Sequence, residues 1–120
     1  MTPSPQTAPL LPATADGVDT MAKFFRALGD PSRLRLLEFV LSEEHSVNEC
    51  VDYIGLSQGR ISAHLACLAD CGFVQVRRSG RHAFYRVIDA RVAELVTLGR
   101  AFAQDNCDAL DACHRIPGGS

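Results

Sequence analysis

The sequence predicts one mainly α-helical domain that carries a single β-hairpin. Three observations favour this fold class: apolar residues recur at three- and four-residue spacing from Met21 to Leu68, the period changes to two between Phe73 and Val87, and a last helical pattern follows Asp89. The length of 120 residues and the 47% hydrophobic content suit one domain of ordinary size.

Composition divides the chain into three segments. Residues 1–17 hold four prolines among small and polar residues, which predicts a flexible N-terminal arm. Residues 18–105 contain the periodic apolar patterns and are expected to form the folded domain. Residues 106–120 are polar and end in Pro-Gly-Gly-Ser, so we expect a flexible C-terminal tail, which carries two cysteines.

Spacing and a helix-start signal predict the first two helices. Met21, Phe24 and Leu28 share one face of an amphipathic helix. Asp30 and Pro31 then begin a second helix, because the Asp30 side chain can cap it and Pro31 suits the first helical position.

The next two helices are short and closely joined. Residues 46–49 read Ser-Val-Asn-Glu, which has capping-box spacing, and the helix that follows ends at Gly55. Ser57 caps another helix, which ends at Gly72. Two short helices with so tight a link are typical of a helix-turn-helix.

Alternating residues then predict a hairpin and a final helix. The segments 73–77 and 83–87 flank Ser79-Gly80 and form the hairpin. Asp89 caps a helix that extends to about Phe102. A hairpin directly after a helix-turn-helix makes the predicted fold a winged helix-turn-helix.

The charges are segregated along the chain. The formal net charge is −2, yet residues 58–87 contain five arginines and one aspartate, a local charge of +4. A helix fits the major groove of DNA, and a hairpin with an arginine-rich tip reaches nearby phosphates or the minor groove. We therefore expect double-stranded DNA as the partner; a merely solvated polar face is the alternative for any single residue. The candidate contacts are Ser57, Gln58, Arg60, Ser62, Arg77, Arg78, Arg81 and His82.

Other classes of protein are disfavoured. No run approaches the ~20 apolar residues that span a bilayer, and no basic and apolar leader begins the chain, so we expect a cytoplasmic protein without membrane contact. A thiol-disulfide enzyme would need a Cys-x-x-Cys motif, which is absent, and no catalytic site or protein substrate is indicated. In a reducing compartment, five cysteines indicate buried residues, reactive thiols or metal ligands.

Several motifs together resemble the ArsR/SmtB family of metal-responsive repressors, over roughly residues 20–103. They are residues 27–37 (ALGDPSRLRLL), 56–57 (LS), 61–65 (ISAHL), 80–82 (GRH) and 84–86 (FYR). The resemblance implies a homodimer, joined through its first and last helices, that binds operator DNA and releases it when metal binds. It also implies that His64 serves DNA contact or packing. The apolar residues of the first and last helices agree, because an isolated winged helix would not need them.

Two metal sites of that family do not fit this chain. The arsenic-type site needs two cysteines at the start of the third helix, where residues 46–48 read Ser-Val-Asn. The zinc-type site on the last helix retains Asp89, but Arg91 and Phe102 stand where nitrogen ligands are needed.

Cys67 and Cys71 remain as candidate ligands, four residues apart on the predicted DNA-reading helix. On a helical wheel they lie about 80–120° from the core stripe of Ile61, Leu65 and Leu68. Their Cβ atoms are expected ~5–6 Å apart, which suits two metal–sulfur bonds to one ion but exceeds the reach of a disulfide. The pair resembles that of the CmtR-like cadmium- and lead-sensing subgroup.

A third sulfur is expected from Cys107 or Cys113 in the tail, and the sequence does not choose between them. Three thiolates select soft ions, namely Cd(II), Pb(II) or Hg(II), with As(III) as an alternative inducer. Cys50 shares a face with Val47 and Ile54, which predicts a buried residue. A thiol-redox-responsive regulator and a metal-blind winged-helix regulator are the remaining alternatives.

Overall fold

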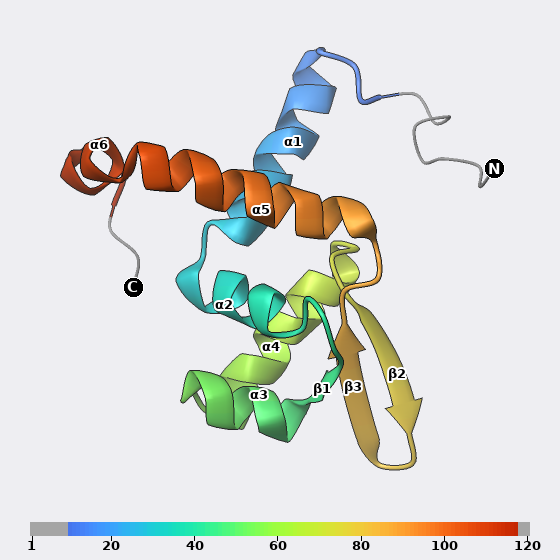
Figure 1. Cartoon of the computed structure of the whole chain (residues 1–120). Helices are drawn as coiled ribbons and strands as arrows, with labels where there is room; N and C mark the ends of the chain where they lie inside the picture. The colour runs from blue at the N-terminus through green and yellow to red at the C-terminus, as the bar shows by residue number, and fades with distance from the viewer. Residues whose placement is uncertain (1–9, 118–120) are drawn as a thin grey trace.

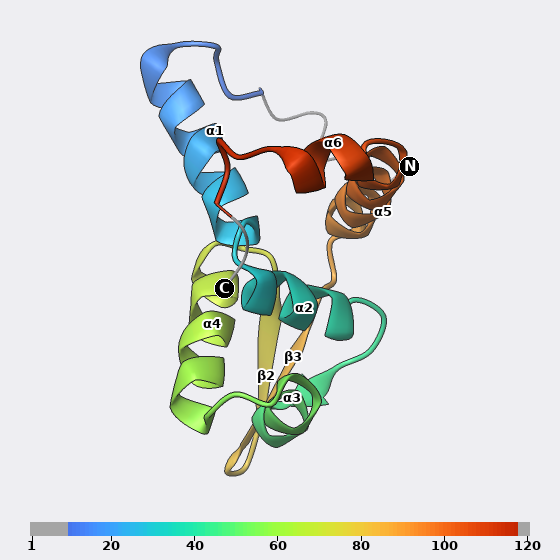
Figure 2. The ribbon, with the colours of Figure 1, turned by 90° about the vertical axis from the view of Figure 1, so that its left-hand side faces the viewer.

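The computed structural model describes residues 10–117 and has six helices and three short strands in this part of the chain (Figures 1 and 2). In chain order the elements are α1 (Ala15–Leu28), α2 (Pro31–Phe39), β1 (His45–Ser46), α3 (Val47–Ile54), α4 (Gln58–Asp70), β2 (Gln75–Ser79), β3 (His82–Arg86), α5 (Ala90–Asp105) and α6 (Cys107–Ala112). The predicted winged helix-turn-helix is confirmed: α3 and α4 form the helix-turn-helix and β2–β3 form the wing.

Hydrogen bonds between side chains and the backbone stabilise the start of α1 and its junction with α2. Thr14 accepts a hydrogen bond from the backbone N–H of Gly17 at 3.4 Å, so α1 begins before the expected boundary at residue 18. Asp30 caps α2 as predicted and accepts from the backbone N–H of Arg33 at 3.0 Å. The Nε of Arg33 in turn donates to the carbonyl of Ala27 at 2.8 Å, which holds the end of α1 against α2.

The predicted helix-turn-helix signals all form. The backbone N–H of Ser46 donates to Glu49 Oε1 at 2.8 Å, and the backbone N–H of Glu49 donates to Ser46 Oγ at 3.2 Å, which completes the capping box of α3. Gly55 ends α3 with φ +86°, a left-handed conformation that favours glycine. Ser57 then caps α4 by accepting from the backbone N–H of Arg60 at 3.3 Å.

The sheet has the strand order β1–β3–β2, and both strand pairs are antiparallel. In the wing, Ser79 pairs with His82 and Arg77 pairs with Phe84. Strand β1 was not predicted, because two residues are too few to show an alternating pattern. It pairs with β3 through His45 and Tyr85 and so joins the wing to the start of α3.

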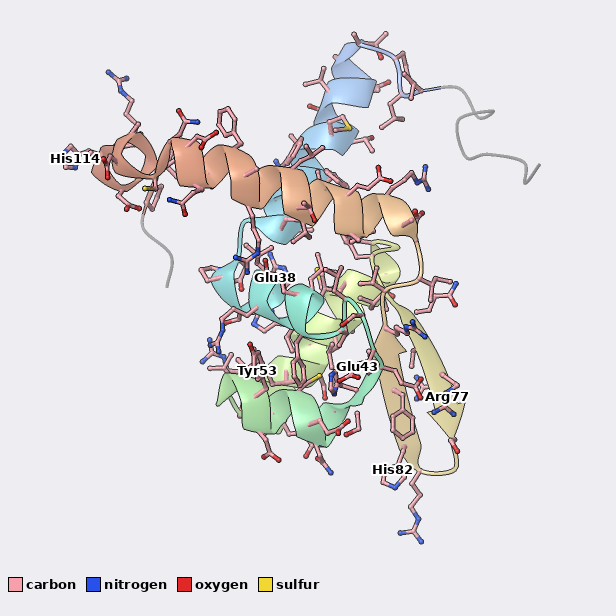
Figure 3. The ribbon with its side chains drawn as sticks, in the orientation of Figure 1. Glu38, Glu43, Tyr53, Arg77, His82 and His114 are labelled. Carbon is pink, nitrogen blue, oxygen red and sulfur yellow. The ribbon has the colours of Figure 1, made fainter. Side chains whose placement is uncertain are left out.

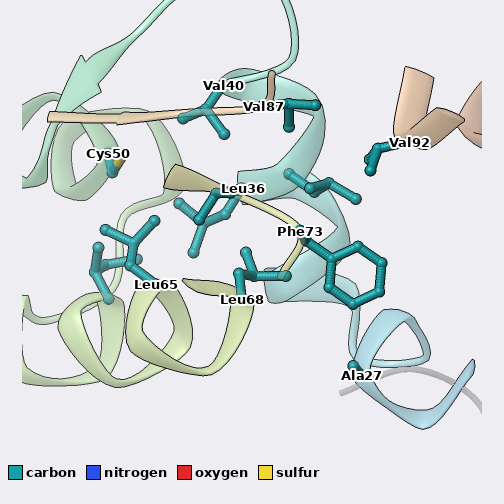
Figure 4. Close-up of a cluster of buried hydrophobic side chains, with 12 residues drawn as sticks. Ala27, Leu36, Val40, Cys50, Leu65, Leu68, Phe73, Val87 and Val92 are labelled. Carbon is teal, nitrogen blue, oxygen red and sulfur yellow. The ribbon is translucent and has the colours of Figure 1, made fainter. Parts of the chain in front are cut away.

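The core lies between α2, α3 and α4 (Figure 4). Its fully buried side chains come from these three helices and from the residue that caps the end of α2: Leu36, Leu37, Val40, Cys50, Ile61, Leu65 and Leu68. The prediction that Cys50 is buried is confirmed. Burial raises the pKa of its thiol to about 11, with a smaller contribution from the charge of Glu49, so Cys50 stays protonated and unreactive near neutral pH.

The structure describes only part of the predicted N-terminal arm and C-terminal tail. Residues 1–9 of the predicted arm and residues 118–120 of the predicted tail lie outside the described residues. The segment expected to be a flexible tail contains α6, which extends from the end of α5. Within residues 10–117, no helix is long and apolar enough to cross a membrane.

Candidate DNA interface and metal centre

Helix α4 presents a polar surface because its other side is fixed in the core. Ile61, Leu65 and Leu68 are fully buried, whereas Gln58 and Arg60 are exposed. Among the other predicted contacts on this helix, Ser57 is exposed, and Ser62 and His64 are half-buried. The first turn of α4, the helix α3 and the tip of the wing lie at one end of the molecule, and α1 and α5 lie at the other (Figures 1 and 2).

The start of α3, the start of α4 and the wing tip enclose one groove of about 260 Å³. Three predicted DNA contacts line it, namely Gln58, Arg81 and His82. The groove is also lined by Asn48, an exposed amide on the first turn of α3 that the sequence analysis missed. Asn48 lies inside the capping box of residues 46–49, a motif that predicts the start of a helix and does not indicate contact with DNA.

The wing arginines do not all have the same surroundings. Arg78 and Arg81 are exposed, and within residues 10–117 neither has an ion pair or a side-chain hydrogen bond. Arg77, in contrast, forms an ion pair with Glu44 in the loop before β1. Figure 3 shows Arg77 on the wing and His82 at its tip.

Cys67 and Cys71 lie together at the opposite end of α4 from its first turn, which carries the predicted DNA contacts. Cys67 is half-buried in the last turn, and Cys71 is the exposed residue that caps the helix. Desolvation, followed by the charge of Cys67 and a hydrogen bond between the two thiols, raises the pKa of Cys71 above 9.0. The predicted pair is therefore close together and off the core, as two sulfur ligands to one ion must be.

An opening of about 410 Å³ lies beside Cys71, between α1, the end of α4 and the start of α5. Its apolar lining includes Phe24, Phe73 and Leu95. Asp89 also lines it, but its carboxylate is engaged, because Arg91 Nη2 donates to Oδ2 at 2.6 Å and the Arg91 backbone N–H to Oδ1 at 2.9 Å. These bonds lower the pKa of Asp89 to about 2.

The tail cysteines are not brought to this pair. Cys107 begins α6, and Cys113 follows it beside the exposed His114, at the end of α5 that projects from the domain (Figure 3). In the part of the chain that the structure describes, no three His, Cys, Asp or Glu side chains are grouped closely enough to hold a metal ion. Within residues 10–117 of a single chain, the two cysteines at the end of α4 therefore have no third group of this kind beside them.

Comparisons with known proteins identify the family of the chain. The family model described as "Bacterial regulatory protein, arsR family" matches residues 30–76. A probable mercury resistance operon repressor of Streptomyces lividans is 57% identical over 100 residues, which cover 83% of this chain and 80% of that protein. The HTH-type transcriptional regulator CmtR of Mycobacterium bovis is 34% identical over 73 residues, 61% of this chain and 62% of that protein.

A solved structure supports the fold. The homodimeric winged helix-turn-helix DNA-binding domain of a possible ArsR-family regulator from Mycobacterium bovis has a TM-score of 0.70 and is 26% identical. The match covers 94% of this chain and 99% of that domain. The chain therefore belongs to the ArsR family and is a transcriptional repressor rather than an enzyme.

Proposed function

We propose that the protein is a homodimeric repressor that binds operator DNA in its metal-free form and releases it when a soft, thiophilic ion binds. Cys67 and Cys71 on α4, together with Cys107 or Cys113 of the tail, hold the ion. The observation that carries the proposal is the adjacent pair of thiols at the end of α4, off the core and beside an opening. The family relation and the name of the Streptomyces lividans relative support a metal effector.

The position of the thiols on α4 supports a direct mechanism. Gln58 and Cys71 are separated by thirteen residues, so about 20 Å of one continuous helix joins the groove-facing turn to the thiols. Cys67 and Cys71 would hold the ion, and recruitment of a third sulfur to it would displace the end of α4. Since α4 is packed as a rigid element, this movement changes how its first turn meets the DNA. Linkage then requires DNA to weaken metal binding by the same factor.

The dimer is supported by apolar surface on α1 and α5. Large exposed side chains gather on these two helices: Val18, Met21, Phe25, Leu98 and Phe102. Between α1, α2 and α5 there is also an apolar depression of about 400 Å³ that includes Phe25 and Leu28. Exposed apolar surface of this kind is typical of a protein–protein interface, and a second copy of the chain would cover it at the end remote from the groove.

A dimer also supplies the missing ligand. Cys71 lies beside the start of α5, whereas Cys107 and Cys113 follow its other end, so the tail cysteines of one chain are remote from its own Cys67 and Cys71. We therefore place the third sulfur on the partner chain. Three thiolates from two chains favour Cd(II), Pb(II) or Hg(II) over hard ions.

The test of the proposed function is a DNA-binding titration in the presence of a non-thiol reductant. Fluorescence anisotropy of duplexes from the protein's own promoter region should show tight binding without metal. Release is expected with Cd(II), Pb(II) or Hg(II) and not with Mg(II) or Ca(II). A protein that ignores all three soft ions but loses DNA when peroxide is added after removal of the reductant would be a thiol-redox regulator. Release by As(III) alone would make it an arsenic sensor.

Arg60 gives a prediction for the DNA face. Arg60→Ala should weaken operator binding by about 1–3 kcal/mol, because a bidentate arginine–guanine contact is lost. Arg115→Ala removes the same charge from an exposed position near the C-terminus and is the matched control. Equal affinities of the two variants, measured by anisotropy at one salt concentration, would remove Arg60 from the interface.

A further inference from the structure

The ion pair between Glu44 and Arg77 distinguishes one wing arginine from the others. Arg77 Nη2 donates to Glu44 Oε1 at 2.6 Å, and Arg77 Nε donates to Glu44 Oε2 at 3.0 Å. This two-point geometry is the strongest arrangement that an arginine and a carboxylate form. It joins β2 to the loop before β1, two segments that are more than thirty residues apart in the sequence.

The pair has further support on both sides. The Arg77 guanidinium lies 4.7 Å from the centre of the Phe84 ring, on the residue that faces Arg77 across the wing. The hydrogen bonds from Arg77 hold the pKa of Glu44 below its usual 4.5, and the positive charge of Arg86 contributes, so Glu44 is ionised near neutral pH. Arg77 is thereby fixed between an aromatic ring and a carboxylate.

The pair is nonetheless at the surface. The side chains of Arg77 and Glu44 are 55% and 38% exposed, so the arrangement does not serve to bury a charge. Exposed ion pairs contribute little to stability, about 0–1 kcal/mol. A contribution to folding alone therefore does not account well for the two-point bond of Arg77, on a wing where Arg78 and Arg81 have no ion pair among the described residues.

The consequence for DNA is electrostatic. Non-specific DNA binding depends on the number of phosphates that lysine and arginine side chains neutralise. While Glu44 holds Nε and Nη2 of Arg77, the two-point Nε/Nη2 edge of the guanidinium is not open to a phosphate, and the Glu44 carboxylate offsets its positive charge. We propose that Glu44 withholds Arg77 from DNA and so limits the affinity of the protein for DNA of any sequence; the inference rests on the proposed DNA-binding function.

The experiment measures binding of the full-length protein to a random-sequence duplex as a function of salt. Glu44→Gln should steepen the slope of log K against log salt by about 0.9, the value for one added phosphate contact, which is about eightfold tighter binding near 0.1 M salt. Arg77→Gln alone should leave the slope unchanged, and the double variant should return to the wild-type slope. Circular dichroism checks that each variant is folded.

Glu43→Gln is the matched control, because it removes the same charge from the neighbouring residue. Glu43 is 74% exposed and lies 3.5 Å from His45 rather than beside an arginine. Identical slopes for Glu44→Gln and Glu43→Gln, or a shallower slope for Arg77→Gln, would overturn the inference and leave the proposed function standing. A wild-type protein with no salt-dependent DNA binding would instead overturn the proposed function.

Discussion

Cys67→Ser and Cys71→Ser are each expected to abolish metal-induced release of DNA while metal-free binding stays intact. Serine keeps the shape of the side chain but replaces a soft thiolate with a neutral, hard hydroxyl. Changes to residues that merely support metal ligands already cost 10–100-fold, so loss of a direct ligand should raise the metal concentration for half-release by about 100-fold or more. Anisotropy titrations with Cd(II) measure this concentration directly.

Cys50→Ala is the control for the loss of a thiol. Cys50 is fully buried and its pKa is raised to about 11, so it offers no thiolate to an ion. This variant should therefore respond to metal as the wild type does. Wild-type release by both Cys67→Ser and Cys71→Ser would exclude the site on α4.

Mixed dimers test whether the third sulfur comes from the partner. Protein with Cys67→Ser is combined with protein that carries both Cys107→Ser and Cys113→Ser, and the subunits are allowed to exchange. If the site is shared, the intact thiol pair of one chain meets the intact tail of the other, and each mixed dimer regains one site. If each site lies within one chain, the mixture stays unresponsive.

The helices and their ends were predictable because their signals are local. The Asp30 cap, the capping box at Ser46 and the left-handed Gly55 each depend on residues within one turn, and each forms as expected. The cysteine pair was predictable for the same reason, because a spacing of four residues places two side chains on one face of a helix. The helix α6 has a weaker local signal in a polar segment and was missed.

The features that sequence reasoning missed depend on contacts between distant segments. Strand β1 exists only because His45 and Ser46 lie beside β3, and the Glu44–Arg77 pair follows from that placement. The tail follows α5, so its position depends on how α5 packs against the domain. One contact in that packing is the bond from Arg100 Nη2 to Glu38 Oε1 of α2, at 2.6 Å. A one-dimensional pattern contains no information about these partners, so Arg77 is indistinguishable in sequence from the free arginines beside it.

Leu65→Ala is expected to cause a large loss of stability. Leu65 is fully buried in the core, and truncation of such a leucine costs about 3–5 kcal/mol through lost apolar contacts and the cavity that remains. The free energy of unfolding of a small domain is only about 5–15 kcal/mol, so this substitution removes a large fraction of it. Urea unfolding of the metal-free protein, followed by circular dichroism, measures the change at constant protein concentration.

Leu65→Met is the paired control, because it keeps most of the volume and should cost less than about 1.5 kcal/mol. A loss below about 1 kcal/mol for Leu65→Ala would mean that α4 is not anchored as the buried stripe requires. The anchoring matters for the mechanism as well as for folding. Leu65 lies on α4 between Arg60 and the thiols at Cys67 and Cys71, so under the proposed mechanism only a helix held firmly at this point would transmit a displacement from the thiols to the first turn.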